Sequence, residues 1–229
     1  MEELLMRSCG HVDASLPSCL HNLSSLVTLV IYNCPNLLSL PAEIVSQLRS
    51  LRGMYVDNCS SLRSLGGLHH LSSLINLHIV NCPRLTDLDP LMFLDVGEGW
   101  GLQKLECLTI SSTSLLSLMM RSSVTALNTL VLYQSTDSVV VHGPHNKKLC
   151  WCFPSVQELL FQDCGNLVAL PEELYTLSTL QFLRIFNCLK IKSLPHTRLP
   201  VSLRTLSFEK CHPLLEEQLK KLKFSYNTA

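Results

Sequence analysis

Long apolar runs, aromatic side chains and an excess of charge of either sign are all scarce in this sequence. No apolar stretch reaches the roughly 18 residues that a membrane-spanning helix needs, and the N-terminus lacks the basic and apolar regions of a signal peptide. Lysine plus arginine and aspartate plus glutamate number 18 each, so the formal net charge is zero. This balance provides no overall field for attracting nucleic acid or an anionic membrane. We therefore expect a cytoplasmic protein that binds neither.

Short motifs of catalysis and nucleotide binding are also absent. The sequence contains no G-x-x-x-x-G-K-[ST], no G-x-S-x-G and no H-E-x-x-H. The glycines of Asp95-Val-Gly-Glu-Gly-Trp-Gly101 lack the spacing of a phosphate-binding loop and predict a flexible insertion. We expect no cofactor and no enzymatic activity.

Leucine is abundant in the sequence, and it recurs in a repeating frame. One position of the frame holds a cysteine in seven copies: Cys9, Cys34, Cys59, Cys82, Cys164, Cys188 and Cys211. Apolar side chains lie eight, five and three residues before each cysteine, as Leu26, Leu29 and Ile31 do before Cys34. Two further copies have Thr113 and Ser135 in the cysteine position, which gives nine copies at intervals of 22 to 31 residues. Most intervals fit the roughly 20–29 residues of a leucine-rich repeat.

The frame predicts an α/β repeat fold, a leucine-rich-repeat solenoid. Residues such as Thr28 to Tyr32 alternate between the two faces of a short strand, and one strand buries its apolar face only when neighbouring repeats stack on it. We expect a curved solenoid with parallel strands on the concave face. Short helices and irregular turns are expected on the convex face, for example over residues 41–48 and 171–177, with a proline at the first helical position.

The frame also predicts the domain organisation. Residues 1–212 would form a solenoid of about nine repeats with insertions near 89–102 and 139–153. Residues 213–229 would form a capping helix and tail, because apolar residues recur there at helical spacing between acidic and basic ones.

The repeated cysteines are interpreted as small buried side chains that donate a weak hydrogen bond to the backbone. Intervals of 23 residues or more do not match the close spacing of zinc ligands. A second group, His142, His145, Cys150 and Cys152, lies within one insertion. We expect a surface loop there, and a metal site remains the alternative.

The candidate binding residues are large side chains that alternate with the apolar core positions on the predicted concave face. They are Tyr32, Tyr55, His78, Tyr133, Phe182, Arg184 and Phe186. Tyrosine, phenylalanine and arginine are typical anchors of protein interfaces. We expect the contact surface in the C-terminal half, around Phe182, Arg184 and Phe186.

The repeat phrasing Leu-x-x-Leu-x-Ile-x-x-Cys-x-x-Leu-x-x-Leu-Pro, with Ile31-Tyr-Asn-Cys-Pro35 and Ile185-Phe-Asn-Cys188, resembles the leucine-rich-repeat region of plant intracellular nucleotide-binding (NLR) disease-resistance proteins. The resemblance implies a protein-interaction scaffold that recognises pathogen effectors or modified host proteins, and that holds the nucleotide-binding domain of the receptor inactive. It implies protein partners only. Because the other domains of that family are absent here, we expect a fragment or a truncated product.

Two alternatives stay open. One is the substrate-receptor repeat domain of an F-box-type ubiquitin ligase, which also uses cysteine in the repeat, although no F-box-like helical segment precedes the repeats. The other is an enzyme whose site lies in the insertion 139–153.

Overall fold

The computed structural model describes residues 2–9, 23–86, 102–112, 115, 124–134, 153–195 and 198–222, with the backbone only for 219–222. The chain divides into two compact units. Unit 1 comprises Met1–Thr109 with Ser114–Leu127, and unit 2 comprises Ile110–Thr113 with Asn128–Ala229. Within the described ranges, every helix is too short or too polar to span a lipid bilayer.

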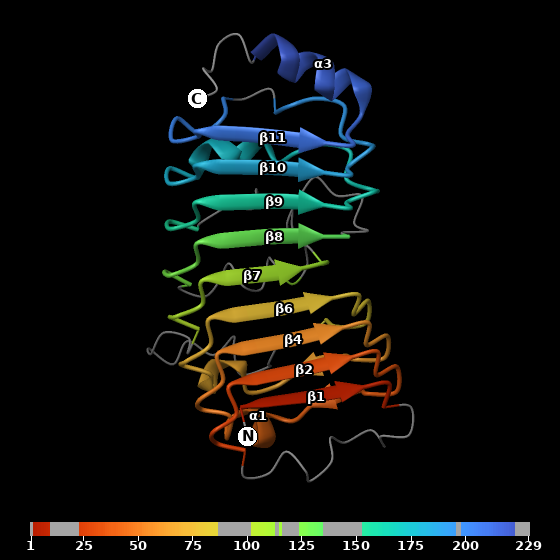
Figure 1. Cartoon of the computed structure of the whole chain (residues 1–229), viewed down its shortest axis with the longest axis vertical. Helices are drawn as coiled ribbons and strands as arrows, with labels where there is room; N and C mark the ends of the chain where they lie inside the picture. Colours follow the sequence, from red (N-terminus) through yellow and green to blue (C-terminus); the bar gives the residue numbers. More distant parts are fainter. Residues whose placement is uncertain are drawn as a thin grey trace. The chain divides into compact units, whose positions relative to one another are not determined.

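Unit 1 is built on parallel strands that pair in chain order (Figure 1). These strands are β1 (Glu3–Arg7), β2 (Thr28–Tyr32), β4 (Gly53–Asp57) and β6 (Asn76–Val80). Strand β7 (Cys107–Ile110) begins beside β6, where the backbone amides of Glu106 and Cys107 donate to the carbonyl oxygen of Ile75. Each strand starts a new repeat at the predicted position.

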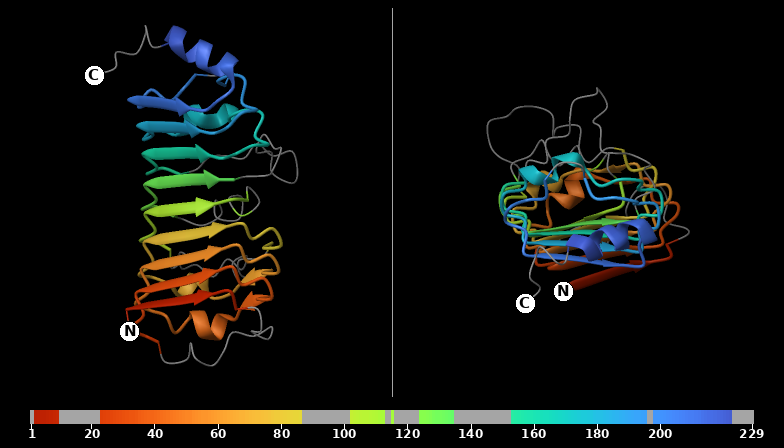
Figure 2. Two further views of the ribbon diagram at one scale, coloured as in Figure 1. Left: turned by 45° about the vertical axis from the view of Figure 1, so that its right-hand side comes forward. Right: turned by 90° about the horizontal axis from the view of Figure 1, so that it is seen from above.

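The return segments of unit 1 lie behind these strands. They contain the paired strands β3 (Ser39–Leu40) and β5 (Ser64–Leu65), the helix α1 (Ala42–Val45) and the 3₁₀ helix η2 (Leu68–His70). Figure 2 shows α1, in orange, on the side of the large sheet opposite its open face. The apolar residues between the two layers include Leu29, Ile31 and Met54, each of which is at most 1% exposed.

Unit 2 repeats the same architecture. Its strands are β8 (Thr129–Tyr133), β9 (Glu158–Gln162), β10 (Phe182–Phe186) and β11 (Thr205–Glu209), all parallel and in chain order. The 3₁₀ helix η4 (Glu172–Thr176) occupies one return segment, and α3 (Pro213–Leu222) follows the last strand. Leu215 of α3 is fully buried, and the Gln218 side chain accepts a hydrogen bond from the backbone amide of Leu194.

The predicted helices over 41–48 and 171–177 are present in shortened form, but the position predicted for their prolines is wrong. Pro41 precedes α1 with an extended backbone, at ψ 139°, and Pro171 precedes η4 in the same way, at ψ 132°. The ring fixes φ near −65°, which both helical and extended residues share, so ψ decides. Each proline is therefore the last extended residue before its helix, and the helix begins one residue later.

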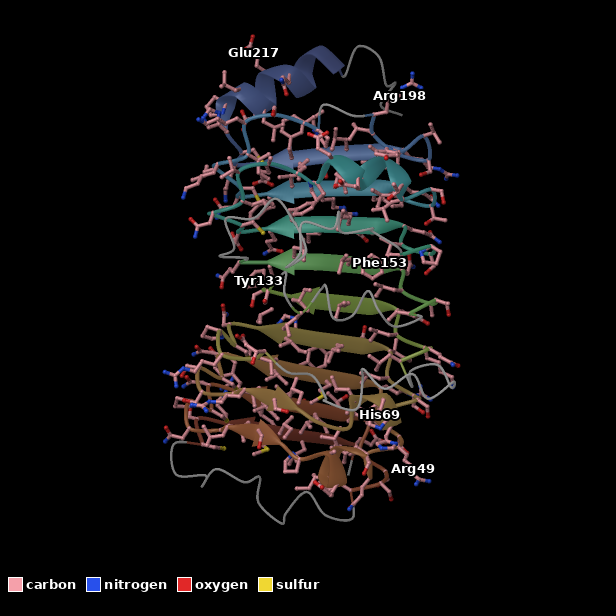
Figure 3. All side chains as sticks on the ribbon, turned by 180° about the vertical axis from the view of Figure 1, so that it is seen from behind. Arg49, His69, Tyr133, Phe153, Arg198 and Glu217 are labelled. Atoms are coloured by element: carbon pink, nitrogen blue, oxygen red, sulfur yellow. The ribbon has the colours of Figure 1, made fainter. Side chains whose placement is uncertain are left out.

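A fourth apolar position of the repeat lies eleven residues before the cysteine. All its described members except the half-buried Leu23 are buried: Leu48, Leu71, Leu102, Val124, Phe153, Leu177 and Pro200. In most repeats the carbonyl of this residue accepts a hydrogen bond from the amide three residues later, as Leu48 does from Leu51. Phe153, labelled in Figure 3, fills the position in the repeat of β9 and is 3% exposed. This position closes the core at the start of each repeat.

Six of the seven repeated cysteines are buried as predicted, whereas Cys9 in the first copy is partly exposed. Cys34, Cys59 and Cys82 are buried free thiols, and each Sγ donates to the carbonyl two residues earlier at 3.2–3.6 Å. In unit 2, Cys188 and Cys211 also reach the carbonyl of the preceding repeat, at 3.6 and 3.5 Å. The thiol thus satisfies backbone oxygens at the point where the strand turns into the core.

The residue before each of the seven repeated cysteines adopts a left-handed backbone, and it is Ser8 in the first of these repeats and Lys210 in the last. Asn33, Asn58, Asn81, Asp163 and Asn187 all have φ between 51 and 56°. Asparagine and aspartate tolerate this region better than other residues with a side chain. Their side chains also form a ladder between repeats, in which Asn58 Nδ2 donates to Asn33 Oδ1 at 2.9 Å and Asn187 Nδ2 donates to Asp163 Oδ1 at 2.7 Å.

Candidate protein-binding surface

The first, third and fifth residues of each long strand point away from the core and form what we call the sheet face. In unit 1 the sheet face consists of Glu3, Leu5, Arg7, Thr28, Val30, Tyr32, Gly53, Tyr55, Asp57, Asn76, His78 and Val80. Strict parallel register places these residues in columns, so that Val30, Tyr55 and His78 are direct neighbours on successive strands. Residues about 25 positions apart in the chain therefore share one surface.

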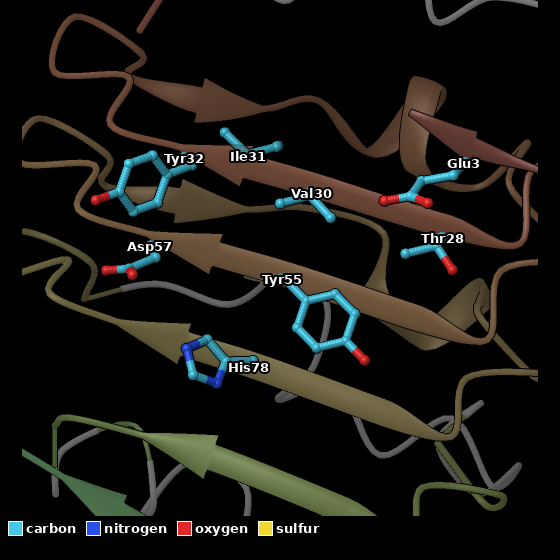
Figure 4. A pocket seen from close by; sticks show the side chains of 8 residues that line it. All are labelled: Glu3, Thr28, Val30, Ile31, Tyr32, Tyr55, Asp57 and His78. Atoms are coloured by element: carbon cyan, nitrogen blue, oxygen red, sulfur yellow. The ribbon is translucent and has the colours of Figure 1, made fainter. Parts of the chain in front are cut away.

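A pocket of about 350 Å³ opens on the sheet face of unit 1. It is lined by Glu3, Thr28, Val30, Ile31, Tyr32, Tyr55, Asp57 and His78. Figure 4 shows Glu3 and Thr28 at one end of the pocket, Tyr32 and Asp57 at the other, and Val30 and Tyr55 between them. The strands β1, β2, β4 and β6 all contribute, so the pocket is a product of repeat stacking.

The Tyr55 ring is placed by the glycine at the start of its own strand. A Cβ atom on Gly53 would lie 2.9 Å from Tyr55 Cε2, closer than real contacts allow. On the opposite side, the Tyr55 and His78 rings are 6.1 Å apart between centroids and tilted by 40°. The glycine thus leaves room for the ring to lie along the strand and form the pocket wall.

Neighbouring groups determine the orientation of Asp57 and the protonation state of His78 in the pocket. Asp57 Oδ1 accepts a hydrogen bond from Asn81 Nδ2 at 3.0 Å, which orients the carboxylate. Burial lowers the pKa of His78, and the charge of Asp57 opposes this shift only in part. His78 is therefore neutral at pH 7 and Asp57 supplies the charge at this end.

Tyr32 is already in contact with a cation. The guanidinium carbon of Arg7 lies 5.3 Å from the centroid of the Tyr32 ring, and the two residues are register partners on β1 and β2. Arg7 is not among the residues that line the pocket. Tyr32 is 39% exposed. The ring thus remains open to solvent despite this contact.

The sheet face of unit 2 contains the other predicted residues. Phe182, Arg184 and Phe186 alternate on β10, and only Arg184 is exposed while the two rings are partly buried. Arg184 Nε lies 3.1 Å from Glu158 Oε1 on β9, and Lys210 Nζ lies 5.1 Å from the centroid of the Phe186 ring. Two of the three predicted anchors are therefore engaged within the unit.

The structure brings three of the seven predicted residues, Tyr32, Tyr55 and His78, into one pocket. It places Tyr133, labelled in Figure 3, at the end of β8 in unit 2. Sequence reasoning missed the carboxylates of Glu3 and Asp57, although they occupy the same alternating positions as the tyrosines. The expected group His142, His145, Cys150 and Cys152, and both expected insertions except residues 102 and 153, lie outside the described residues.

No part of the described structure groups three or more metal-ligating side chains. Two of the buried cysteines, Cys59 and Cys188, are also unsuited to nucleophilic chemistry. A hydrogen bond with the Cys82 side chain and burial raise the pKa of the Cys59 thiol, and Cys164 and burial do the same for Cys188. These thiols stay protonated at neutral pH.

Comparison with solved structures identifies the architecture. The leucine-rich-repeat domain of the type III effector XCV3220 (XopL) aligns with 94% of this chain and 78% of its own, at a TM-score of 0.58 and 24% sequence identity. The fold is that of a leucine-rich-repeat domain. Stacked repeats of this kind create extended surfaces that many solenoid proteins use for binding.

Other comparisons are weaker. The Leptospira interrogans leucine-rich-repeat protein LIC12759 matches at a TM-score of 0.47 and 18% identity, over 96% of this chain but 58% of its own. The plant peptide hormone receptor RGFR1 in complex with RGF2 matches at a TM-score of 0.19 and 15% identity, over 92% and 55% of the two chains. Neither score supports an argument. No family model matches the sequence, and neither does any curated protein.

Proposed function

We propose that this leucine-rich-repeat domain binds a protein partner through its sheet face and is not an enzyme. One observation carries the proposal: an open pocket of about 350 Å³ with exposed aromatic and charged side chains on a parallel sheet. Aromatic residues in a concave, partly desolvated surface are the usual anchors of protein recognition.

We propose further that the domain senses ligands in a plant intracellular NLR receptor, where it recognises a pathogen effector or a modified host protein in the cytoplasm. The support is the repeat phrasing around Cys34 and Cys188, with an asparagine before each cysteine. The nucleotide-binding domain of the same receptor is the expected intramolecular partner.

The test is affinity purification of the full chain from plant-cell extract, with and without pathogen challenge. A double variant Tyr32→Ala/Tyr55→Ala removes the pocket walls of unit 1, and Phe182→Ala/Phe186→Ala removes the aromatic positions of unit 2. Tyr175→Ala is the matched control, because this tyrosine is 52% exposed but lies on η4 and not on the sheet face.

We expect an immune nucleotide-binding protein or an effector to be recovered with the wild type and the control, and lost with at least one double variant. Equal recovery with all variants would rule out the sheet face as the binding surface. Recovery of a cullin-type ligase scaffold would instead support the F-box alternative and contradict the immune role.

A further inference from the structure

The charges that line the pocket of unit 1 have one sign. Glu3 and Asp57 contribute carboxylates, and none of the lining residues is a lysine or an arginine. Within the described part of the chain, no hydrogen bond or ion pair engages the exposed Glu3 side chain. Neutral His78 adds no positive charge at pH 7. Although Arg7 packs on the Tyr32 ring, it does not line the pocket, and the lining itself favours a cation over an anion such as a phosphate.

The walls between the two carboxylates suit a planar cation with an apolar stem. Tyr32 and Tyr55 present aromatic rings, Val30 presents aliphatic atoms in the middle of the pocket, and Thr28 lies at the Glu3 end (Figure 4). The contact between Arg7 and Tyr32, at 5.3 Å, is an example within the same surface of a guanidinium held by this ring. Arginine combines stacking on an aromatic face with a donor fork that matches a carboxylate, which a lysine ammonium does not.

We propose that the pocket receives an arginine side chain of the bound protein, with its stem on Val30, its guanidinium against a tyrosine ring and its charge neutralised by Asp57 or Glu3. This inference rests on the proposed function of the sheet face as a protein-binding surface. It goes beyond that function by naming the type of partner residue that the pocket recognises. The volume of about 350 Å³ lies at the low end of the roughly 300–1,000 Å³ of ligand pockets, which fits one side chain and its flanking backbone.

The test is a titration of the full ¹⁵N-labelled chain with three capped tripeptides, followed by amide chemical shifts. The peptides are Ac-Gly-Arg-Gly-NH₂, its citrulline analogue of nearly the same shape but without charge, and the glutamate analogue. We expect the arginine peptide to shift the amides of Val30, Tyr55 and His78 in the millimolar range, and the other two peptides to bind at least about fivefold more weakly.

Two conservative variants test the carboxylates. Asp57→Asn retains an oxygen that can accept from Asn81, and Glu3→Gln changes an exposed side chain, so neither disrupts the core. Each is expected to weaken binding of the arginine peptide by about three- to fivefold. Glu106→Gln is the control, because this exposed glutamate of unit 1 does not line the pocket, and it should leave the affinity unchanged.

Three results would overturn the proposal: equal binding of the arginine and citrulline peptides, stronger binding of the glutamate peptide, or no shift at the pocket amides with any peptide. Each of these leaves the proposed function separately testable. If the partner is still lost with Tyr32→Ala/Tyr55→Ala while Asp57→Asn has no effect on its capture, the sheet face binds protein but does not recognise an arginine.

Discussion

Gly53 and Tyr55 occupy the same face of strand β4, and the missing side chain of the first makes space for the ring of the second. A Cβ atom at Gly53 would lie 2.9 Å from Tyr55 Cε2, 3.4 Å from its hydroxyl oxygen and 3.5 Å from Cζ. The ring of a tyrosine can rotate around two side-chain torsion angles. The close contact is therefore relieved by rotation of the ring and not by a shift of the backbone. A glycine within the strand thus shapes the pocket without taking part in the core.

Gly53→Ala should therefore change binding and leave folding intact. We expect the Tyr55 ring to rotate away from β4, the affinity for the arginine tripeptide to change, and the unfolding free energy to change by less than about 1 kcal/mol. Gly165→Ala in unit 2 is the control, because no heavy atom lies within 4 Å of the added Cβ. An unchanged Tyr55 ring environment in aromatic NMR spectra would contradict the expectation.

Gly67→Ala, in contrast, should lower the stability of the fold. Gly67 has φ +75°, and its added Cβ would meet the backbone oxygen of Ala42 at 2.8 Å, where neither atom can rotate away. We expect a loss of about 2 kcal/mol or more in chemical denaturation. A loss no larger than that of Gly165→Ala would show that the return segment of this repeat adapts to the substitution.

The asparagine ladder allows the backbone and side-chain contributions at Asn58 to be separated. Asn58→Ala places an alanine at φ 55° and removes the hydrogen bond to Asn33, so we expect a destabilisation of about 1–2 kcal/mol. Asn58→Gly removes the same hydrogen bond but accepts the left-handed backbone, and should cost less. Equal losses for both variants in urea unfolding would assign the whole effect to the side chain.

The buried thiols should resist alkylation until the chain unfolds. Hydrogen bonding with a cysteine of the neighbouring repeat, followed by burial, raises the pKa of Cys59 and of Cys188, so the reactive thiolate is scarce as well as buried. In pulsed iodoacetamide labelling at pH 8, we expect both to react at least about a hundredfold more slowly in the native chain than in guanidinium. Peptide mapping by mass spectrometry distinguishes the sites, and native labelling as fast as in the denatured chain would contradict the burial.

The stability of unit 1 should depend on pH through His78. Burial holds the folded-state pKa of His78 below the 6.5 of an unperturbed histidine, so the unfolded chain binds more protons as the pH falls. His78 should therefore contribute a loss of stability that begins near pH 6.5 and is complete below its folded pKa. Compared with His78→Gln, the wild type should lose more unfolding free energy between pH 7.5 and pH 5.5, and parallel losses would contradict this assignment.

Much of the fold could be predicted from the sequence because the same pattern of apolar residues recurs in every repeat. The apolar frame around Cys34 recurs at every strand, and both strand positions and buried residues follow from it. Two further signals were readable and were missed: the apolar residue eleven before the cysteine, and the asparagine or aspartate directly before it. The apolar residue recurs wherever the sequence extends eleven residues before the cysteine position, and an asparagine or aspartate precedes five of the seven repeated cysteines, with Ser8 and Lys210 before the other two.

The candidate site could be predicted only in part. The alternation of the strands indicates that Tyr32, Tyr55 and His78 face outward, but the favoured set around Phe182 lies where Glu158 and Lys210 already engage Arg184 and Phe186. Whether Phe182, Arg184 and Phe186 form the contact surface stays a prediction.

The sequence by itself determined the repeat, the direction in which each side chain leaves its strand, and the burial of cysteine and leucine, because the same apolar frame recurs in every repeat and stacked copies must share one core. Only the tertiary structure decided that Glu3, Tyr32, Tyr55 and Asp57 enclose one pocket. That outcome depends on the register between strands some 25 residues apart and on the space above Gly53, and neither is a property of any single repeat.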